Sequence, residues 1–278
     1  MENHFLLLPA WDPVAFSIGP LSVHWYGLSY LVSFLLAWRY GLWVIKRYAL
    51  PITAEQWGDA MLLWCVLGVL IGGRLGYVFL YHPAYYLANP HEIFFIWRGG
   101  MSFHGGMVGA GCAVMLYGRS VGVSGVRFVD LVALVSPVGL FFGRLANFVN
   151  GELYGRVSHV PWAMIFPHSD GMPRHPSQLY EAALEGIVLG TILFLCVVCG
   201  RRRGGVLETR GMMMFLFLLG YGLMRFIVEF WREPDAHIGY IAGLWSLGQI
   251  LSALMVVAGA VGLWVIHKKA QRRTEGMA

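Results

Sequence analysis

The sequence predicts an all-α polytopic membrane protein with seven transmembrane helices and a small extracytoplasmic head. Of 278 residues, 58% are hydrophobic and only 13% are charged, whereas a soluble domain has about 25% charged side chains. Such a composition leaves too few charges to cover a soluble surface, and 15% aromatic residues exclude a disordered chain. Seven helices of about 20 residues use about half of the chain, so we expect residues 1–278 to form a single integral membrane domain.

Seven apolar runs of spanning length, each bounded by charged or turn residues, justify the number of helices. Within two of these runs, Gly68, Gly72, Gly105 and Gly109 recur at spacings of four residues, which predicts close helix packing. In chain order the runs are Leu21–Ile45, Trp57–Leu80, Met101–Tyr117, Phe128–Val149, Ser177–Cys199, Gly211–Phe230 and Ile241–Ile266.

The lysines and arginines between the runs predict the orientation of the chain. They alternate between one side that carries twelve and another that carries four, and the basic side faces the cytoplasm by the positive-inside rule. The N-terminus is therefore expected outside and the C-terminus inside. The segments 82–100 and 151–176, rich in Pro, His, Tyr and Asn, are expected to form the extracytoplasmic head. The twelve residues are Lys46, Arg47, Arg119, Arg127, Arg201, Arg202, Arg203, Arg210, Lys268, Lys269, Arg272 and Arg273.

Neither the net charge of +5 nor the four cysteines points to a nucleic-acid partner, a metal or a cofactor. The basic residues are spread between apolar runs rather than gathered in one patch. Cys196 and Cys199 have the spacing of a redox or zinc motif, but they lie in an apolar helix without further ligands. We expect all four cysteines to be free thiols.

Three arginines within the apolar runs are candidates for function, because a charge in hydrocarbon costs about 2.5 kcal/mol or more. Arg74, Arg144 and Arg225 each lie in the later half of a helix that runs outward, and His104 opens a helix that starts from outside. An arginine binds phosphate through two parallel hydrogen bonds, so a phospholipid headgroup in the outer leaflet fits this group. The alternative for Arg225 is an ion pair with Glu229, four residues later. The role of Arg74 stays open.

The densest polar stretch runs from Gly143 to Arg156, where a membrane helix ends. On a helix, Arg144 and Asn147 share a face and Asn150 lies one turn further. Glu152 follows in a turn bounded by glycines. Polar side chains therefore line one stripe of an otherwise apolar helix.

This stretch resembles the signature of the bacterial prolipoprotein diacylglyceryl transferase family, Gly-Arg-x-(Gly/Ala)-Asn-Phe-x-Asn-x-Glu-x-x-Gly, which here extends from Gly143 to Gly155. Ala146 stands where many relatives have Gly, and the segment between Arg156 and Arg174 is shorter than in some relatives. Further stretches of the same family match in order along nearly the whole chain: His24–Leu28, Gly72–Tyr77, Met101–Gly106, Arg174–Glu181 and Tyr221–Phe230.

The resemblance implies an enzyme of the bacterial cytoplasmic (inner) membrane, with its active site toward the outer leaflet. Such a transferase moves the diacylglyceryl group of phosphatidylglycerol to the thiol of the lipobox cysteine in a prolipoprotein signal peptide. A thioether forms and glycerol phosphate is released, as the first step of lipoprotein maturation. Because the substrate supplies the thiol, the enzyme needs no cysteine, metal or cofactor of its own.

The resemblance also implies roles for individual residues. His104 is expected to be the general base or proton relay for the thiol, with a structural histidine at a helix N-terminus as the alternative. Arg144 and Arg225 are expected to hold the phosphate. Asn150 has turn capping as its alternative, and the two tyrosines have a place in an aromatic belt as theirs. The expected substrate-binding residues besides the arginines are Tyr26, Asn147, Asn150, Glu152, Gly155, Tyr221 and Glu229.

Two other classes of membrane protein compete with this interpretation. A transporter also places ionisable groups in helices, but usually near the midplane and between inverted repeats. An intramembrane serine protease needs an activated serine. The chain has no Gly-x-Ser-x-Gly motif, although Ser102 lies two residues before His104.

Overall fold

Helices account for each of the apolar runs found in the sequence. The computed structural model describes residues 5–19, 21–167, 169–200, 205–233, 240–241 and 244–275. Arg201, Arg202 and Arg203 of the expected cytoplasmic side lie outside the described residues, as do residues 242–243 of the seventh run. The chain divides into two compact units, Met1–Ala37 with Ala133–Ala278 and Trp38–Val132, which we describe separately.

Five helices are long and apolar enough to cross a membrane: Trp25–Tyr48, Ala54–Leu80, Gly125–Val149, Ser177–Gly200 and Leu247–Arg272. Met212–Val228 is a shorter apolar helix. Phe103–Ser120 has 18 residues, of which five are glycine, so its hydropathy is lower. The chain is thus mostly helical, as a polytopic membrane protein would be. The individual helices are α1 (Trp25–Tyr48), α2 (Ala54–Asp59), α3 (Val66–Leu80), α5 (Phe103–Ser120), α6 (Gly125–Val149), α7 (Ser177–Glu181), α8 (Leu189–Gly200), α9 (Met212–Val228) and α10 (Leu247–Glu275).

Two of the long helices contain a π-helical turn, at Ala60–Cys65 between α2 and α3 and at Ala182–Val188 between α7 and α8. Such turns are rare and are found often at functional sites. The second turn carries a buried carboxylate, Glu185.

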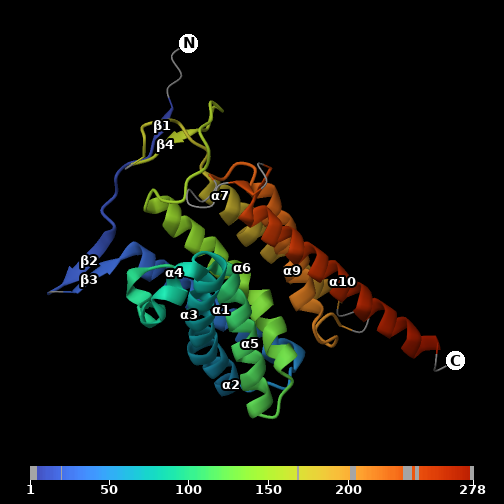
Figure 1. The fold of residues 1–278 in the computed structure, drawn as a ribbon. Coiled ribbons are helices and arrows are strands. Elements are labelled where there is room, and N and C mark those ends of the chain that lie inside the picture. Colours follow the sequence, from blue (N-terminus) through green and yellow to red (C-terminus); the bar gives the residue numbers. More distant parts are fainter. Residues whose placement is uncertain are drawn as a thin grey trace. The chain divides into compact units, whose positions relative to one another are not determined.

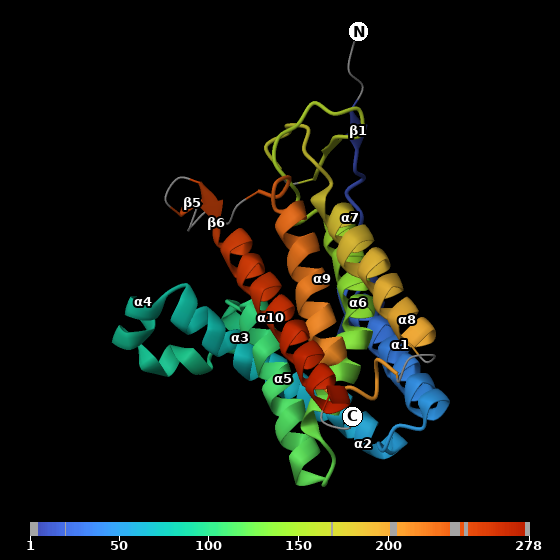
Figure 2. The same cartoon turned by 90° about the vertical axis from the view of Figure 1, so that its right-hand side faces the viewer.

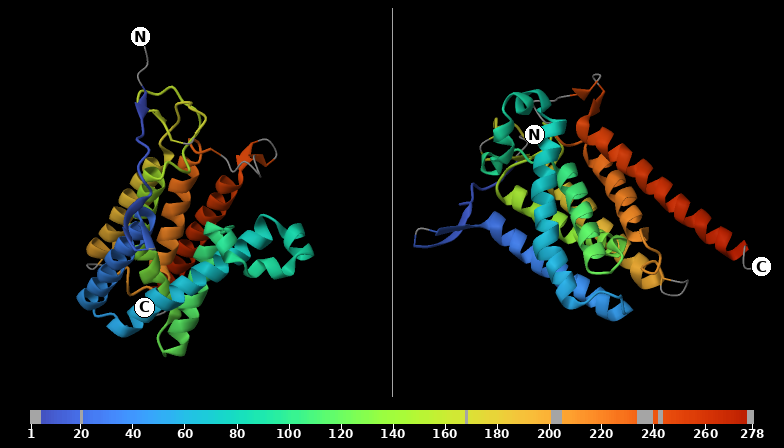
Figure 3. Two further views of the ribbon diagram at one scale, coloured as in Figure 1. Left: turned by 90° about the vertical axis from the view of Figure 1, so that its left-hand side faces the viewer. Right: turned by 60° about the horizontal axis from the view of Figure 1, so that its bottom comes forward.

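In the unit Trp38–Val132, α3 and α5 lie side by side (Figures 1 and 3). Glycines on both helices bring the two backbones together. A Cβ atom on Gly72 would meet backbone atoms of Gly105 and Gly109, and one on Gly109 would meet those of Gly68 and Gly72. The close packing predicted from the glycine spacing is confirmed.

The segment 82–100 forms a small helical arm in the same unit. It consists of α4 (Pro83–Ala88) and two 3₁₀ turns, Pro90–Phe94 and Ile96–Arg98. The arm projects from the end of α3, as Figure 2 shows. Several of its large apolar side chains are exposed, among them Leu87, Phe94 and Trp97.

In the other unit, α9 packs along α10, and α7 and α8 lie beside α9 (Figure 2). The π-helical turn packs on α6 through Gly186, where a Cβ atom would meet backbone and side-chain atoms of Phe141. Arg144 lies one turn beyond Phe141 on α6. The close approach at Gly186 therefore brings the carboxylates of the neighbouring helix to the level of Arg144.

A small loop-rich head covers one end of this unit. Strand β1 (Leu6–Leu7) pairs in parallel with β4 (Met164–Ile165), and Met164 also bridges to Arg174. Arg174 donates to Asp170 at 2.7 Å, and this hydrogen bond lowers the pKa of Asp170 to about 2. The head is therefore held together by short backbone bridges and charged contacts, together with the buried side chains of Ala163 and Phe166.

Two of the predicted helix starts are wrong. Leu21–His24 is strand β3, which pairs antiparallel with β2 (Val14–Ile18), and α1 begins only at Trp25 (Figure 3). Strand β5 (Tyr240–Ile241) pairs with β6 (Trp245–Ser246), and α10 begins at Leu247. Short apolar runs fit a strand as well as a helix, so hydropathy alone did not separate them.

Candidate functional site

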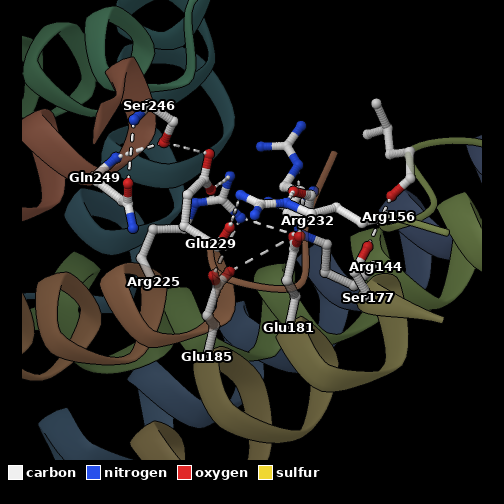
Figure 4. Close-up of polar contacts among 11 residues, drawn as sticks. Arg144, Arg156, Ser177, Glu181, Glu185, Arg225, Glu229, Arg232, Ser246 and Gln249 are labelled. Carbon is white, nitrogen blue, oxygen red and sulfur yellow. Dashed lines mark hydrogen bonds and ion pairs between the residues drawn. The ribbon is translucent and has the colours of Figure 1, made fainter. Parts of the chain in front are cut away.

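Two carboxylates bring Arg144 of α6 and Arg225 of α9 together (Figure 4). Glu181 Oε2 lies 2.5 Å from Arg144 Nε, and Glu181 Oε1 lies 3.0 Å from Arg225 Nη1. Glu185 faces the same two groups at 3.8 Å and 3.6 Å. The two arginines expected to act together are therefore held in one cluster.

From the sequence, Glu181 and Glu185 are only possible partners for other helices, and the structure places both in this cluster. Glu181 ends α7 and Glu185 follows four residues later in the π-helical turn, so both point from one face of the helix. Both side chains are fully buried. A buried carboxylate is stable only with a charged partner, so two acids four residues apart in an apolar run were a signal for basic partners on neighbouring helices.

Glu229 completes the surroundings of Arg225. Its Oε2 lies 2.9 Å from Arg225 Nη2, so the ion pair that the spacing offers as the alternative for Arg225 is present. Ser246 Oγ donates to Glu229 Oε1 at 2.9 Å. Ser246 and Gln249 also cap the start of α10 reciprocally, at 3.1 Å in each direction. The first turn of α10 therefore fixes the Glu229 carboxylate from the side opposite Arg225.

Two further arginines lie at the edge of the cluster (Figure 4). Arg232 Nε lies 3.8 Å from Glu181 Oε1. Arg156 donates from Nε to the carbonyl of Arg232 at 2.8 Å and from Nη2 to the carbonyl of Glu229 at 3.2 Å. In the sequence both arginines lie between apolar runs, on the side with few basic residues. In the structure Arg232 lies near the buried Glu181, and Arg156 binds the backbone next to it.

Glu152 accepts hydrogen bonds from the polar side chains that follow Arg144 in the sequence. Its Oε1 accepts from Asn147 Nδ2 at 2.9 Å and from Asn150 Nδ2 at 3.4 Å. Gln178 Nε2 donates to its backbone carbonyl at 2.7 Å, which ties this turn to α7. The polar stripe thus ends in one carboxylate that two amides orient.

The position of Gly155 in the turn after the helix predicts a backbone conformation that other residues resist, but the structure gives a different reason for glycine. Positive φ angles occur at Gly151 (65°) and Leu153 (56°) but not at Gly155. A Cβ atom on Gly155 would collide with the backbone carbonyl of Trp231 and with His175. Close packing, and not an unusual conformation, therefore demands glycine at this position.

The two tyrosines of the expected site have different surroundings. The Tyr26 hydroxyl lies 3.1 Å from that of Tyr30, and the two rings pack edge to face. Tyr221 lies on α9 one turn before Arg225, is 1% exposed and stacks on Phe217. Tyr221 is therefore a buried neighbour of the cluster, whereas a residue of an aromatic belt would face lipid.

His104 is the second residue of α5, in the unit Trp38–Val132. Ser102 caps this helix, since its Oγ accepts from the backbone of Gly105 at 3.2 Å. The imidazole is half-buried and its ring packs edge-on against Phe103. A role for His104 together with the arginine cluster stays a prediction.

Arg74, whose role was open, anchors the arm of its own unit. The side chain is buried and donates only to backbone carbonyls: Nε to Ile93 at 2.8 Å, Nη2 to Glu92 at 2.7 Å, and Nη1 to Gly99 at 2.6 Å and Gly100 at 3.2 Å. These contacts use four of the five N–H groups of the guanidinium. Arg74 therefore has a structural explanation that needs no ligand.

Comparison with known proteins identifies close relatives of this chain. A family model described as prolipoprotein diacylglyceryl transferase matches residues 13–265. A phosphatidylglycerol–prolipoprotein diacylglyceryl transferase of Rhodospirillum rubrum is 51% identical over 267 residues, which cover 96% of each chain. Proteins with the same name from Brucella anthropi and Brucella canis are 47% and 48% identical over 273 residues, again 96% of each chain.

Proposed function

The chain belongs to the prolipoprotein diacylglyceryl transferase family, and from this premise we propose how its residues perform the reaction. The protein is a transferase that moves the diacylglyceryl group of phosphatidylglycerol to a prolipoprotein, the first step of lipoprotein lipidation. The transporter and serine protease alternatives are thereby set aside. The acceptor in our proposal is the thiol of the lipobox cysteine in the signal peptide.

We propose that Arg144 and Arg225 bind the phosphate of phosphatidylglycerol. The observation that carries this proposal is their common attachment to Glu181, which holds two guanidinium groups from different helices in one buried cluster. The carbon–oxygen bond to the phosphate breaks during transfer, and negative charge grows on the departing glycerol phosphate. Fixed cations at that point stabilise the transition state more than the bound substrate, which is what accelerates a reaction.

His104 takes the proton of the thiol in this proposal. The sulfur then attacks the lipid carbon as the phosphate leaves, so that one carbon–sulfur bond forms and one carbon–oxygen bond breaks. An imidazole suits this task because its pKa is ordinarily near neutrality, and the thiolate is the reactive form of a thiol. The half-buried position at the start of α5 supports the role, since a water-exposed base would exchange its proton with solvent.

Replacing His104 by Gln should lower kcat about 10²- to 10⁴-fold, because glutamine keeps a polar side chain but accepts no proton. The purified protein is incubated with phosphatidylglycerol and a lipobox peptide, and mass spectrometry follows the thioether adduct. His175 is the matched control: it is also partly buried in a loop-to-helix segment, and His175→Gln should retain turnover. Full turnover by His104→Gln would remove this residue from catalysis.

The remaining expected residues shape the site around the phosphate. Asn147 and Asn150 orient the Glu152 carboxylate, which can accept from the headgroup hydroxyls of phosphatidylglycerol. Tyr26 and Tyr221 supply hydroxyl groups next to apolar surface, where an acyl chain meets a headgroup. Glu229 contributes through Arg225, which it holds at 2.9 Å.

We further propose that the chain crosses the bacterial inner membrane seven times, with its N-terminus outside and its active site toward the outer leaflet. Five helices that meet the length and hydropathy of a span support this, together with the shorter apolar α9 and the glycine-rich α5. Green fluorescent protein fused after residue 278 should fluoresce in bacteria. Alkaline phosphatase inserted at residues 158–160 should be active. The reverse pattern would contradict the orientation.

A further inference from the structure

Arg144 and Arg225 differ in which edge of the guanidinium the carboxylates occupy. In Arg225, Nη1 faces Glu181 and Glu185, and Nη2 faces Glu229. In Arg144, both acids of the neighbouring helix lie against Nε. Nε is thus the nitrogen of Arg144 that lies nearest to either carboxylate, whereas in Arg225 the nearest nitrogens are the two Nη atoms.

The two arginines also differ in how deeply their side chains are buried. The side chain of Arg225 is 5% exposed, whereas that of Arg144 is 15% exposed. A guanidinium is planar and presents its N–H groups in fixed directions, so a carboxylate at Nε determines where the two Nη groups point. The N–H groups along one edge of a guanidinium can bind two phosphate oxygens in parallel.

Glu181 is itself held in a fixed position. Its Oε2 contacts Arg144 and its Oε1 contacts Arg225, so the carboxylate bridges two helices and cannot turn without losing one contact. It is fully buried at the end of α7. Without it, only the more distant Glu185, at 3.6–3.8 Å, would face both guanidinium groups, and their mutual repulsion in this buried environment would be less well compensated.

We propose that Glu181 is a positioning residue for the transfer reaction: it binds Nε of Arg144 and thereby turns the Nη edge of that guanidinium toward the lipid phosphate. This inference rests on the proposal that Arg144 binds the phosphate. It adds that the carboxylate acts through one atom of Arg144, and not only as a counter-charge for the fold. Glu181 does not touch the substrate.

A double-mutant cycle tests this role, with kcat/KM measured by formation of the thioether peptide from phosphatidylglycerol. Glu181→Gln in the native background should lower kcat/KM about 100-fold, because a displacement of about 1 Å in a binding group has that effect. Lysine has no Nε, so in the background of Arg144→Lys the same change should cost less than about threefold. A residue that merely stabilises the fold would cost the same factor in both backgrounds, and equal factors would overturn the inference.

Glu185→Gln is the matched comparison, since it removes the same charge from the same two arginines but only from contacts of 3.6–3.8 Å. Its loss should be at least about tenfold smaller than that of Glu181→Gln, given how steeply such contacts depend on geometry. An equal loss of activity in the two variants would mean that the negative charge, and not its position, determines the effect.

If Glu181→Gln does not fold, Glu181→Asp, which shortens the reach by one methylene, takes its place in the cycle. If Arg144→Lys itself changes neither lipid KM nor kcat, the phosphate-binding proposal fails instead.

Discussion

Replacing Arg144 by Ala should lower kcat/KM for phosphatidylglycerol about 10²- to 10³-fold or more, as removal of one fixed donor to a developing anion does. The truncation also removes the contact of Glu181 and Glu185 with α6, which leaves them Arg225 and, for Glu181, the more distant Arg232. Breaking a buried ion pair from one side destabilises a protein by about 3–5 kcal/mol. We therefore expect a lower thermal midpoint as well as a loss of activity, measured on the same purified sample.

Arg39→Ala is the control for this variant. Arg39 also lies within an apolar helix, but its side chain is exposed. Both activity and thermal midpoint should stay close to those of the native protein. To separate folding from chemistry, activity is expressed per folded molecule. Native turnover and lipid binding by folded Arg144→Ala would end the phosphate-binding model.

Replacing Gly109 by Ala should have the largest effect on folding. The added methyl group would meet the backbone of Gly68 and Gly72 on α3, and a backbone cannot move aside as a side chain can. Overpacking of a tight contact costs about 3 kcal/mol, and a leucine at this position should prevent folding altogether. Thermal unfolding in detergent and the yield of monodisperse protein measure the effect.

Gly111 on the same helix provides the matched control. Nothing lies within 4 Å of the position that its Cβ atom would occupy. Gly111→Ala should be neutral or slightly stabilising, because alanine is favoured over glycine in a helix by about 1 kcal/mol. Equal destabilisation by both substitutions would mean that the packing of α3 on α5 does not depend on these contacts.

The helices and their approximate bounds followed from hydropathy because the bilayer imposes one length and one kind of side chain on each span. The glycine contact between α3 and α5 was predictable for a similar reason, since small residues at spacings of four mark one helix face. The two hairpins that precede α1 and α10 were not predictable. Strands β3 and β6 fall within the apolar runs of the helices that follow, so only backbone pairing separates strand from helix.

The candidate site was predicted in part. The sequence picked out Arg144, Arg225 and the pairing with Glu229, because charges in apolar helices are rare enough to identify singly. It did not assign Glu181 and Glu185 to these arginines, since the partner of a buried charge depends on which helices are neighbours. Arg232 was missed because it follows the end of α9 in the sequence, where a basic residue needs no explanation.

Arg74 holds the arm in place without contacting its side chains through hydrogen bonds. All of its hydrogen bonds end on main-chain oxygens of the arm, and main-chain oxygens are the same whatever side chain the residue carries. Only Gly99 and Gly100, both with φ of 81°, constrain the residue type at the points of attachment. The exposed side chains of the arm, among them Leu87, Phe94 and Trp97, therefore take no part in its attachment through Arg74.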